Sequence, residues 1–409
     1  MRLAILHFTP PGVIGGVEQV MQEHITRLRE RGFDIAVIAG RQAGGVHVIP
    51  ELDAAGEESR TIEAELADGR VTARFEAARE SVLARLEPLV AQADRVIVHN
   101  AFTLHFSLPL TAALWQLAEE RTPGSVLAWS HDLSWSNELY IPTLHSGYPW
   151  NLLREPAPNT RYVTVSEQRR LELATLWRLP GSDISVIPNG IDPDVFLRLS
   201  EEGRSLARRY RLYDRDAVIL LPVRVTRRKN IEAGIRAVRA LKNVGMDVRF
   251  VVTGPTAPHH PIRSAQYLDE LKALRAELGL DDEVVFLAEV LERTPGQRTL
   301  GDLYALADIL LLPSASEGFG LPILEAGLAR VPVALSDIPI FREVSGGYGA
   351  TFSLDSSADR IAESIMELLH QESTRLRRRV LSEYSWDRIV DERLVPLLTA
   401  GPEGGVVTE

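Results

Sequence analysis

The chain has 409 residues, of which 45% are hydrophobic and 25% are charged, and its formal net charge at pH 7 is -11. This length predicts two domains, and the negative charge argues against a general nucleic-acid-binding protein. There is no cysteine, which excludes disulfides and thiolate metal sites. The first residues resemble a strand rather than a signal peptide, and no apolar run approaches the roughly 20 residues of a transmembrane helix. We therefore expect a cytoplasmic protein without an integral membrane segment.

Short apolar runs alternate with helical segments through the first half of the chain. The runs are residues 3–7, 35–39, 95–99, 126–130, 162–165 and 185–188. Helical spacing of apolar side chains is clearest over residues 17–31, and further helices are expected over 70–89, 108–121 and 167–179. This alternation predicts a doubly wound parallel sheet.

Ligands of such sheets bind at the carboxyl ends of the strands, so the residues just after the strands are candidates for a site. These include the pair Gly15 and Gly16, then Asn100, and then His131 with Asp132. The glycine pair opens a helix but lacks the G-x-G-x-x-G spacing of dinucleotide binders, and a tight turn is its alternative explanation.

Aromatic side chains are concentrated after Asp132, among them Trp135 and Tyr140. Sugars expose polar edges and apolar C–H faces, so rings beside hydrogen-bonding groups suit a carbohydrate acceptor. We take Asn100, Asp132, Trp135 and Tyr140 as candidate acceptor residues. An ordinary loop packed with aromatic rings is the alternative.

Turn-forming residues mark a boundary near the middle of the chain. Pro188, Asn189, Gly190 and Pro193 lie within six positions, after a predicted strand and before a new series of elements. We expect an interdomain linker here.

The second half again alternates strands and helices. Strands are predicted at residues 217–222, 247–253, 283–287, 308–313, 331–335 and 350–352. Helices are predicted at 201–210, 231–244, 267–278, 303–307, 359–369 and 386–398, with a loop over 288–302. This pattern predicts a second parallel sheet.

A basic cluster follows the first strand of the second half. Arg224, Arg227, Arg228 and Lys229 fall within six positions, between a strand end and a helix start. In an acidic protein this placement predicts a diphosphate clamp, with Arg224 and Lys229 as the preferred ligands. A solvated surface is the alternative.

A glycine loop follows the predicted strand at 308–313. Gly318 and Gly320 let the backbone approach a ligand, and Pro322 suits a helix start. Glu317 precedes the helix, and Glu325 is expected in its first turn. Strand, glycine loop and helix N-terminus make an anion site, and two carboxylates add acceptors for hydroxyls. A nucleotide sugar carries both phosphate and hydroxyls.

In order and spacing, these residues resemble a retaining GT-B glycosyltransferase of the family 4 type (glycosyl transferases group 1). The motifs that carry the resemblance are Gly15-Gly16, His131-Asp132, residues 188–192, Arg224 with Lys229, Gly254, and the Glu317-to-Glu325 pattern. The resemblance implies an α/β fold with two facing Rossmann-like doubly wound parallel-sheet domains and an interdomain cleft. Residues 1–192 would form the N-terminal acceptor-side domain, with a C-terminal helix at about 384–400 crossing back. Residues 193–383 would form the nucleotide-sugar-binding domain.

The resemblance also implies roles for individual residues. The catalytic set would be His131 near the reacting centre, Glu317 on the sugar hydroxyls, and Arg224 and Lys229 on the diphosphate. Glu325 would bind the ribose. The remaining donor-binding residues would be Gly15, Gly16, Gly254, Gly318, Phe319, Gly320 and Leu321.

The expected reaction is transfer of an α-linked hexose from a UDP- or GDP-linked sugar to a hydroxyl acceptor, with retention by a front-face mechanism. No metal or other cofactor is expected. A nucleotide-sugar epimerase, a sucrose- or trehalose-type synthase, and a non-catalytic nucleotide-sugar-binding protein are the alternatives. The sequence leaves open the base, the hexose, the acceptor and whether the chain forms homo-oligomers.

Overall fold

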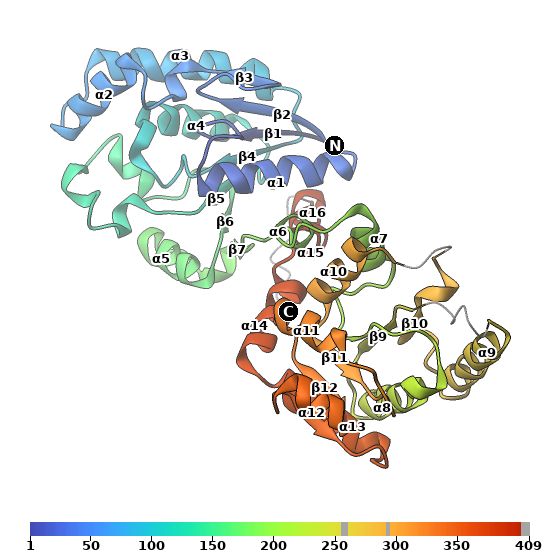
Figure 1. The fold of residues 1–409 in the computed structure, drawn as a ribbon. Coiled ribbons are helices and arrows are strands. Elements are labelled where there is room, and N and C mark those ends of the chain that lie inside the picture. The colour runs from blue at the N-terminus through green and yellow to red at the C-terminus, as the bar shows by residue number, and fades with distance from the viewer. Residues whose placement is uncertain (255–260, 292–294, 402–409) are drawn as a thin grey trace. The chain divides into compact units, whose positions relative to one another are not determined.

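The computed structural model describes residues 1–254, 261–291 and 295–401, with side chains from all of these except 261–264. The chain forms two compact units (Figure 1). We call Met1–Gly190 with Trp386–Glu409 the N-terminal unit, and Ile191–Ser385 the second unit.

A parallel sheet of seven strands organises the N-terminal unit. Its strands in chain order are β1 (Arg2–Leu6), β2 (Asp34–Ala39), β3 (Val46–Val48), β4 (Arg95–His99), β5 (Val126–Ser130), β6 (Thr160–Thr164) and β7 (Ile184–Val186). Their order across the sheet is β3-β2-β1-β4-β5-β6-β7, and all pairs are parallel.

The helices of this unit include segments from both ends of the chain. The α-helices are α1 (Gly16–Glu30), α2 (Glu57–Ala67), α3 (Ala73–Val90), α4 (Leu108–Glu120), α5 (Glu167–Trp177), α15 (Trp386–Ile389) and α16 (Val395–Thr399). A π-helical turn, η9 (Val390–Leu394), joins α15 to α16, and short 3-10 turns include η1 (Pro50–Leu52), η2 (His105–Ser107) and η3 (Ser134–Ser136).

Alternate residues of β1 enter different cores because successive strand side chains point to opposite faces. Leu3 and Ile5 belong to a cluster that contains side chains of α1 and of the C-terminal residues 386–398. Ala4 and Leu6 belong to a second cluster with side chains of α3 and α4. Both faces of the sheet are therefore covered, as a parallel sheet requires.

The second unit contains a six-stranded parallel sheet. Its strands are β8 (Ala217–Leu221), β9 (Val248–Val252), β10 (Val284–Phe286), β11 (Ile309–Leu312), β12 (Val333–Ser336) and β13 (Ala350–Phe352), in the order β10-β9-β8-β11-β12-β13. Its helices are α6 (Pro193–Phe196), α7 (Glu201–Arg209), α8 (Ile231–Asn243), α9 (Pro261–Glu277), α10 (Gln297–Leu306), α11 (Leu321–Ala329), α12 (Pro339–Ser345), α13 (Ala358–Leu369) and α14 (Glu372–Glu383).

The prediction of two α/β domains with parallel sheets is confirmed, and every predicted strand is present. The predicted loop over 288–302 is wrong in part, because α10 already begins at Gln297. The sequence analysis also missed β3, α2, the four-residue α6, α12 and α14. β3 and α12 are three and seven residues long, and α2 and α14 are rich in charged side chains, so the apolar periodicity is short or weak. Among the helices of the described residues, none is long and apolar enough to cross a membrane.

Candidate functional site

In the second unit, the strand order reverses between β8 and β11. The chain runs from β8 to β9 and β10 toward one edge of the sheet, and β11, β12 and β13 then fill the other side. Open α/β sheets bind ligands at the carboxyl ends of the strands beside such a reversal. The loops after β8 and β11 meet this description, and they carry the basic cluster and the glycine loop.

Backbone and side-chain hydrogen bonds fix these two loops to each other. The amide of Ala315 donates to the carbonyl of Arg228 at 2.8 Å, and Arg228 Nη1 donates to the carbonyl of Ser316 at 3.0 Å. Ser336, at the end of β12, donates its hydroxyl to the carbonyl of Ser314 at 2.5 Å. The glycine loop therefore has a defined position relative to the basic cluster.

Glu317 is the centre of this arrangement. Its Oε1 accepts from Ser314 Oγ at 2.9 Å and pairs with Lys229 Nζ, while its Oε2 accepts from Arg228 Nη1 at 3.2 Å. Burial lowers the pKa of Lys229 below its usual range, and the hydrogen bond to Glu317 opposes this shift. The sequence analysis gave Glu317 to the sugar and Lys229 to the diphosphate, but the structure joins them in one ion pair.

The structure divides the four cations of the basic cluster. Arg227 pairs with Glu270 at 2.6 Å, and its guanidinium lies 4.9 Å from the ring centroid of Tyr267. Arg224 is exposed and makes no ion pair or side-chain hydrogen bond with the part of the chain that the structure describes. Of the two preferred clamp residues, Arg224 is thus available to an anion, whereas Lys229 is engaged by Glu317.

Two of the predicted glycines have a structural reason to be glycine. Gly320 precedes α11 with φ of +98°, a conformation that side chains disfavour. A Cβ on Gly254 would collide with the backbone of Val223 and Arg224. The chain after β9 therefore packs directly on the loop that carries Arg224. The neighbours Phe319 and Leu321 are 51% and 60% exposed, which leaves this loop accessible to a ligand.

Glu325 lies just past the first turn of α11, where it was expected. Because α11 begins at Leu321, Glu325 is its fifth residue, and the expectation of a first-turn carboxylate was wrong. Its Oε2 accepts a hydrogen bond from the hydroxyl of Tyr304 at 2.7 Å. Burial, with the hydrogen bond to Glu325, raises the pKa of Tyr304.

In the N-terminal unit, the strand order reverses between β1 and β4. A cavity of about 410 Å³ lies at this point. The loops after β1 and β4 contribute to its lining, together with residues from the segments after β2 and β5. The lining residues are His7, Phe8, Thr9, Gly16, Val17, Glu18, Arg41, Asp53, Ala54, Ala55, Asn100, Leu104, Phe106, Asp132 and Tyr140. Three of the four predicted acceptor residues, Asn100, Asp132 and Tyr140, are therefore brought together.

Asn100 shapes the cavity through the backbone. It has φ of +61°, and its buried Oδ1 accepts from the amides of His131 at 2.8 Å and Asp132 at 3.3 Å. Asp132 is exposed and pairs with Arg169 at 3.1 Å. Asn100 thus holds the turn after β5 in place.

Trp135 is separate from this cavity. Its Nε1 donates to the carbonyl of Trp150 at 3.4 Å, and the guanidinium of Arg154 lies 4.7 Å from its ring centroid. Within the described part of the N-terminal unit it packs against another apolar cluster and does not line the cavity.

His131 belongs to a buried group of histidines. The residue is 7% exposed, and its Nε2 lies 3.1 Å from His99 Nδ1. Burial lowers the pKa of His131 to about 3, with smaller effects from His24 and His7. The imidazole is therefore neutral at pH 7, and it is not among the described residues that line the cavity. The sequence signal, a histidine at a strand end, did not reveal these buried neighbours.

Gly15 and Gly16 differ in their surroundings. Gly16 is the first residue of α1 and lines the cavity. Gly15 precedes the helix in an extended conformation, and a Cβ there would collide with the carboxylate of Glu18. The sequence analysis missed Glu18, because an acid in the first helical turn is common and carries no further signal.

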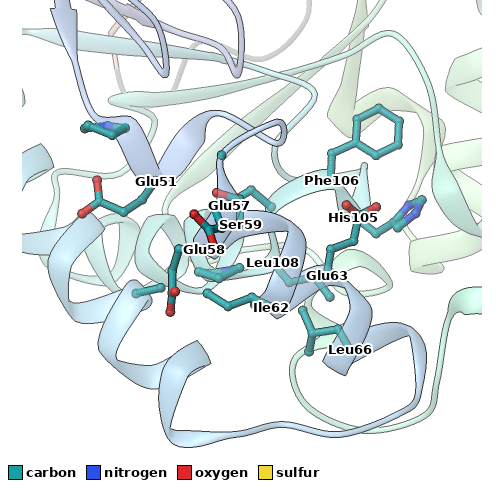
Figure 2. A pocket seen from close by; sticks show the side chains of 15 residues that line it. Glu51, Glu57, Glu58, Ser59, Ile62, Glu63, Leu66, His105, Phe106 and Leu108 are labelled. Atoms are coloured by element: carbon teal, nitrogen blue, oxygen red, sulfur yellow. The ribbon is translucent and has the colours of Figure 1, made fainter.

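A second, more apolar cavity of about 250 Å³ lies beside α2 (Figure 2). Ile62, Leu66 and Leu108 contribute apolar surface, and Phe106 lines both cavities. Figure 2 shows Glu51 toward one end of this cavity, with His105 and Phe106 toward the other. Sequence periodicity gave no signal for it, because its walls come from separate segments, residues 50–66, 78 and 105–109.

No group of three or more histidine, aspartate or glutamate side chains in the described residues is arranged to hold a metal ion. Whether the reaction needs a metal remains a prediction from the sequence.

Two family models match the chain over adjoining segments. The model described as Glycosyltransferase Family 4 matches residues 14–195, and the model described as Glycosyl transferases group 1 matches residues 204–385. The two matches cover the two candidate regions described above.

Curated proteins that are similar in sequence include named glycosyltransferases. An uncharacterized glycosyltransferase of Methanocaldococcus jannaschii is 31% identical over 56% of this chain and 57% of its own length. A GDP-mannose-dependent alpha-(1-6)-phosphatidylinositol monomannoside mannosyltransferase of Mycobacterium tuberculosis is 25% identical over 63% of this chain and 65% of its own length. These two matches span less than two thirds of either relative. Mannosylglucosylglycerate synthase of Thermotoga maritima is 24% identical over 84% of this chain and 82% of its own length.

Proposed function

We propose, from the premise that the chain belongs to the glycosyltransferases of group 1, that it transfers a hexose from a nucleotide-diphosphate sugar to a hydroxyl of an acceptor. The donor would bind at the loops after β8 and β11 of the second unit. The acceptor would bind in the cavity of the N-terminal unit.

The observation that carries this proposal is the composition of the loops after β8 and β11. Arg224 is exposed and unpaired among the described residues, on a loop joined to the glycine loop through Arg228. A nucleotide diphosphate needs such a cation, and the α11 N-terminus adds backbone N–H groups and a favourable dipole. Glu317 and Glu325 add carboxylates that accept hydrogen bonds from sugar hydroxyls.

Departure of the leaving group would place negative charge on the diphosphate. Arg224, Lys229 and the amides of residues 318–321 would stabilise that charge in the transition state. For Lys229 to contribute, donor hydroxyls would have to share Glu317 with it. We propose retention of configuration by a front-face mechanism, in which the leaving phosphate takes the proton of the acceptor, and no need for a metal.

Mannose is the first hexose to test. The names of the Mycobacterium and Thermotoga relatives both refer to mannosyl products or mannosyl transfer, and the first specifies GDP-mannose. We therefore propose GDP-mannose as the donor, with UDP-glucose and ADP-glucose as comparison compounds.

Thermal unfolding in the presence of each nucleotide sugar tests donor binding, because a ligand of the native state raises Tm by mass action. We expect GDP-mannose to raise Tm, and GDP to be released when a hydroxyl acceptor is added. Failure of all three compounds to raise Tm would refute the donor site. Binding without release in a broad acceptor panel would favour a non-catalytic binding protein, and conversion of the sugar without an acceptor would favour an epimerase.

Two arginines of the basic cluster provide a matched pair of variants. We expect Arg224→Ala to weaken GDP-mannose binding roughly 10- to 100-fold, as expected for loss of a charge-assisted hydrogen bond. Arg227→Ala should change it little, because Glu270 already engages this side chain. Equal effects of the two variants would contradict the assignment of Arg224.

Activity that disappears with EDTA and returns with a divalent ion would contradict metal independence.

A further inference from the structure

Among the acids that line the cavity of the N-terminal unit, Glu18 has the least exposed side chain. Its Oε1 accepts a hydrogen bond from Thr9 Oγ1, and His7 Nε2 lies 3.8 Å from the same oxygen. Only 13% of its side chain is exposed. No described residue donates a hydrogen bond to its Oε2. The second oxygen is therefore an acceptor held in place without a protein donor.

Gly15 provides the room for this carboxylate. The Cβ of any other residue at position 15 would collide with Glu18 Oε2. The backbone of Gly15 is extended, with φ of -177°, so its conformation does not require glycine. A side chain at position 15 would therefore displace the Glu18 carboxylate from this position.

Carboxylates outnumber cations in the lining of the cavity, and Glu18 is the one whose charge no lysine or arginine of the described residues balances. Glu18, Asp53 and Asp132 line it, and Arg41 is the one guanidinium among its described lining residues. Arg41 is already bound to Asp53 at 2.8 Å, and Asp132 pairs with Arg169 outside the lining. Burial lowers the pKa of His7, which disfavours a positive charge on this ring.

The second cavity is also lined by carboxylates. It adjoins the first at Phe106, and its described lining has carboxylates from Glu51, Glu57, Glu58 and Glu63 but no lysine or arginine. An acceptor that extended past Phe106 would meet apolar surface and further negative charge (Figure 2).

We propose that the cavity of the N-terminal unit selects an uncharged polyhydroxyl acceptor, such as a neutral sugar or cyclitol, and rejects phosphorylated or carboxylated ones. Glu18 is the residue that accepts a hydrogen bond from an acceptor hydroxyl. Gly15 is a positioning residue that acts through Glu18. The inference rests on the proposed function, because it names the acceptor class of the same reaction.

Direct binding tests the acceptor class without turnover. Ligand-observed NMR would compare methyl α-D-mannopyranoside and myo-inositol with mannose 6-phosphate and myo-inositol 1-phosphate. We expect the anionic compounds to bind about tenfold more weakly or worse, because the uncompensated carboxylate of Glu18 repels them. Equal or tighter binding of the phosphates, or no binding by either neutral compound, would overturn the proposal.

Variants of two residues on α1 test the role of Glu18. We expect Glu18→Gln to weaken neutral-probe binding roughly 10-fold or more, as for loss of a hydrogen bond to a charged group. Glu30→Gln is the matched control, because Glu30 is exposed at the other end of the helix. Unchanged binding in Glu18→Gln, or an equal loss in Glu30→Gln, would remove Glu18 from the acceptor site.

A double-mutant cycle tests Gly15. Gly15→Ala should weaken probe binding in the wild-type background and have no further effect in Glu18→Ala, which has no carboxylate to displace. Additive effects would overturn the positioning role. Circular dichroism and urea unfolding serve as folding controls for the variants. Loss of donor binding in the wild type would refute the proposed function, whereas donor binding without neutral-probe binding would refute only this inference.

Discussion

The Nζ of Lys229 and the carboxylate of Glu317 form an ion pair in which the two side chains are only 10% and 11% exposed. Such a pair compensates two charges that have lost much of their hydration. Arg228 and Ser314 complete the coordination of the carboxylate. The site is therefore held together by the same groups that are proposed to act on the donor.

Lys229→Met should reduce the free energy of unfolding of the second unit by about 2–3 kcal/mol, because it leaves Glu317 buried without its closest cation. The double variant Lys229→Met/Glu317→Gln should recover part of this stability but not sugar transfer. Urea unfolding and GDP release measure the two effects. A single variant as stable as the wild type would show that the pair carries no stability.

Gly320→Ala should destabilise the protein by about 1–2 kcal/mol and weaken donor binding, since Gly320 has φ of +98° and a side chain is disfavoured there. Gly318→Ala is the matched variant, because a Cβ at Gly318 meets no atom within 4 Å. It should leave the unfolding free energy nearly unchanged. Equal destabilisation by both substitutions, measured in urea, would contradict this distinction.

Tyr304→Phe should raise the KM for the donor roughly 3- to 10-fold, because Glu325 loses the hydroxyl that orients it. Tyr213→Phe is a control in the same unit, since the Tyr213 hydroxyl donates to Asp194 at 2.5 Å. Both variants should lose some stability, but only Tyr304→Phe should change the KM. A donor KM unaffected by Tyr304→Phe would separate Glu325 from the ribose.

His24→Phe should make stability less dependent on pH. Burial lowers the pKa of His24 from 6.5 to about 3, and neither ring nitrogen has a hydrogen-bond partner in the described residues. Between pH 6.5 and 3 the unfolded chain binds a proton that the folded chain does not. The free energy of unfolding should therefore fall with decreasing pH, by up to about 1.4 kcal/mol per pH unit for this group.

The measurement for His24 is urea unfolding at pH 7 and pH 5, followed by tryptophan fluorescence. The rings of Trp129 and Trp386 lie 4.6 and 5.5 Å from His24. The loss of stability between the two pH values should be smaller in His24→Phe than in the wild type. His47→Gln, at an exposed position of β3, should keep the wild-type dependence. An unchanged dependence in His24→Phe would contradict the prediction.

The sheets and the glycine loop could be predicted from the sequence because their signals are local. Buried parallel strands appear as short apolar runs, and Gly320 lies where a strand meets a helix. The partners of the site residues could not be predicted in this way. Tyr304 and Glu325 are 21 positions apart, and Lys229 and Glu317 are 88 positions apart. No spacing rule along the chain specifies such pairs.

The environment of His131 also could not be predicted from the sequence. Its position at a strand end favoured a role at the surface of the site, but its ring stacks on His99 of β4, which in turn contacts His24 of α1. Glu18 was missed because its environment depends on Thr9 and on the missing side chain of Gly15. Tertiary neighbours, rather than residue type, distinguish these two cases.

The C-terminal segment has a consequence for the order in which the chain matures during translation. Trp386, Val390, Leu394 and Leu398 are buried in the same cluster as Leu3 of β1. The residues of the second unit are continuous in sequence, so the whole of that unit is synthesised before residues 386–398. One apolar face of the N-terminal sheet therefore lacks its C-terminal cover until residue 398 has been synthesised. Until then this face is exposed to chaperones and to aggregation.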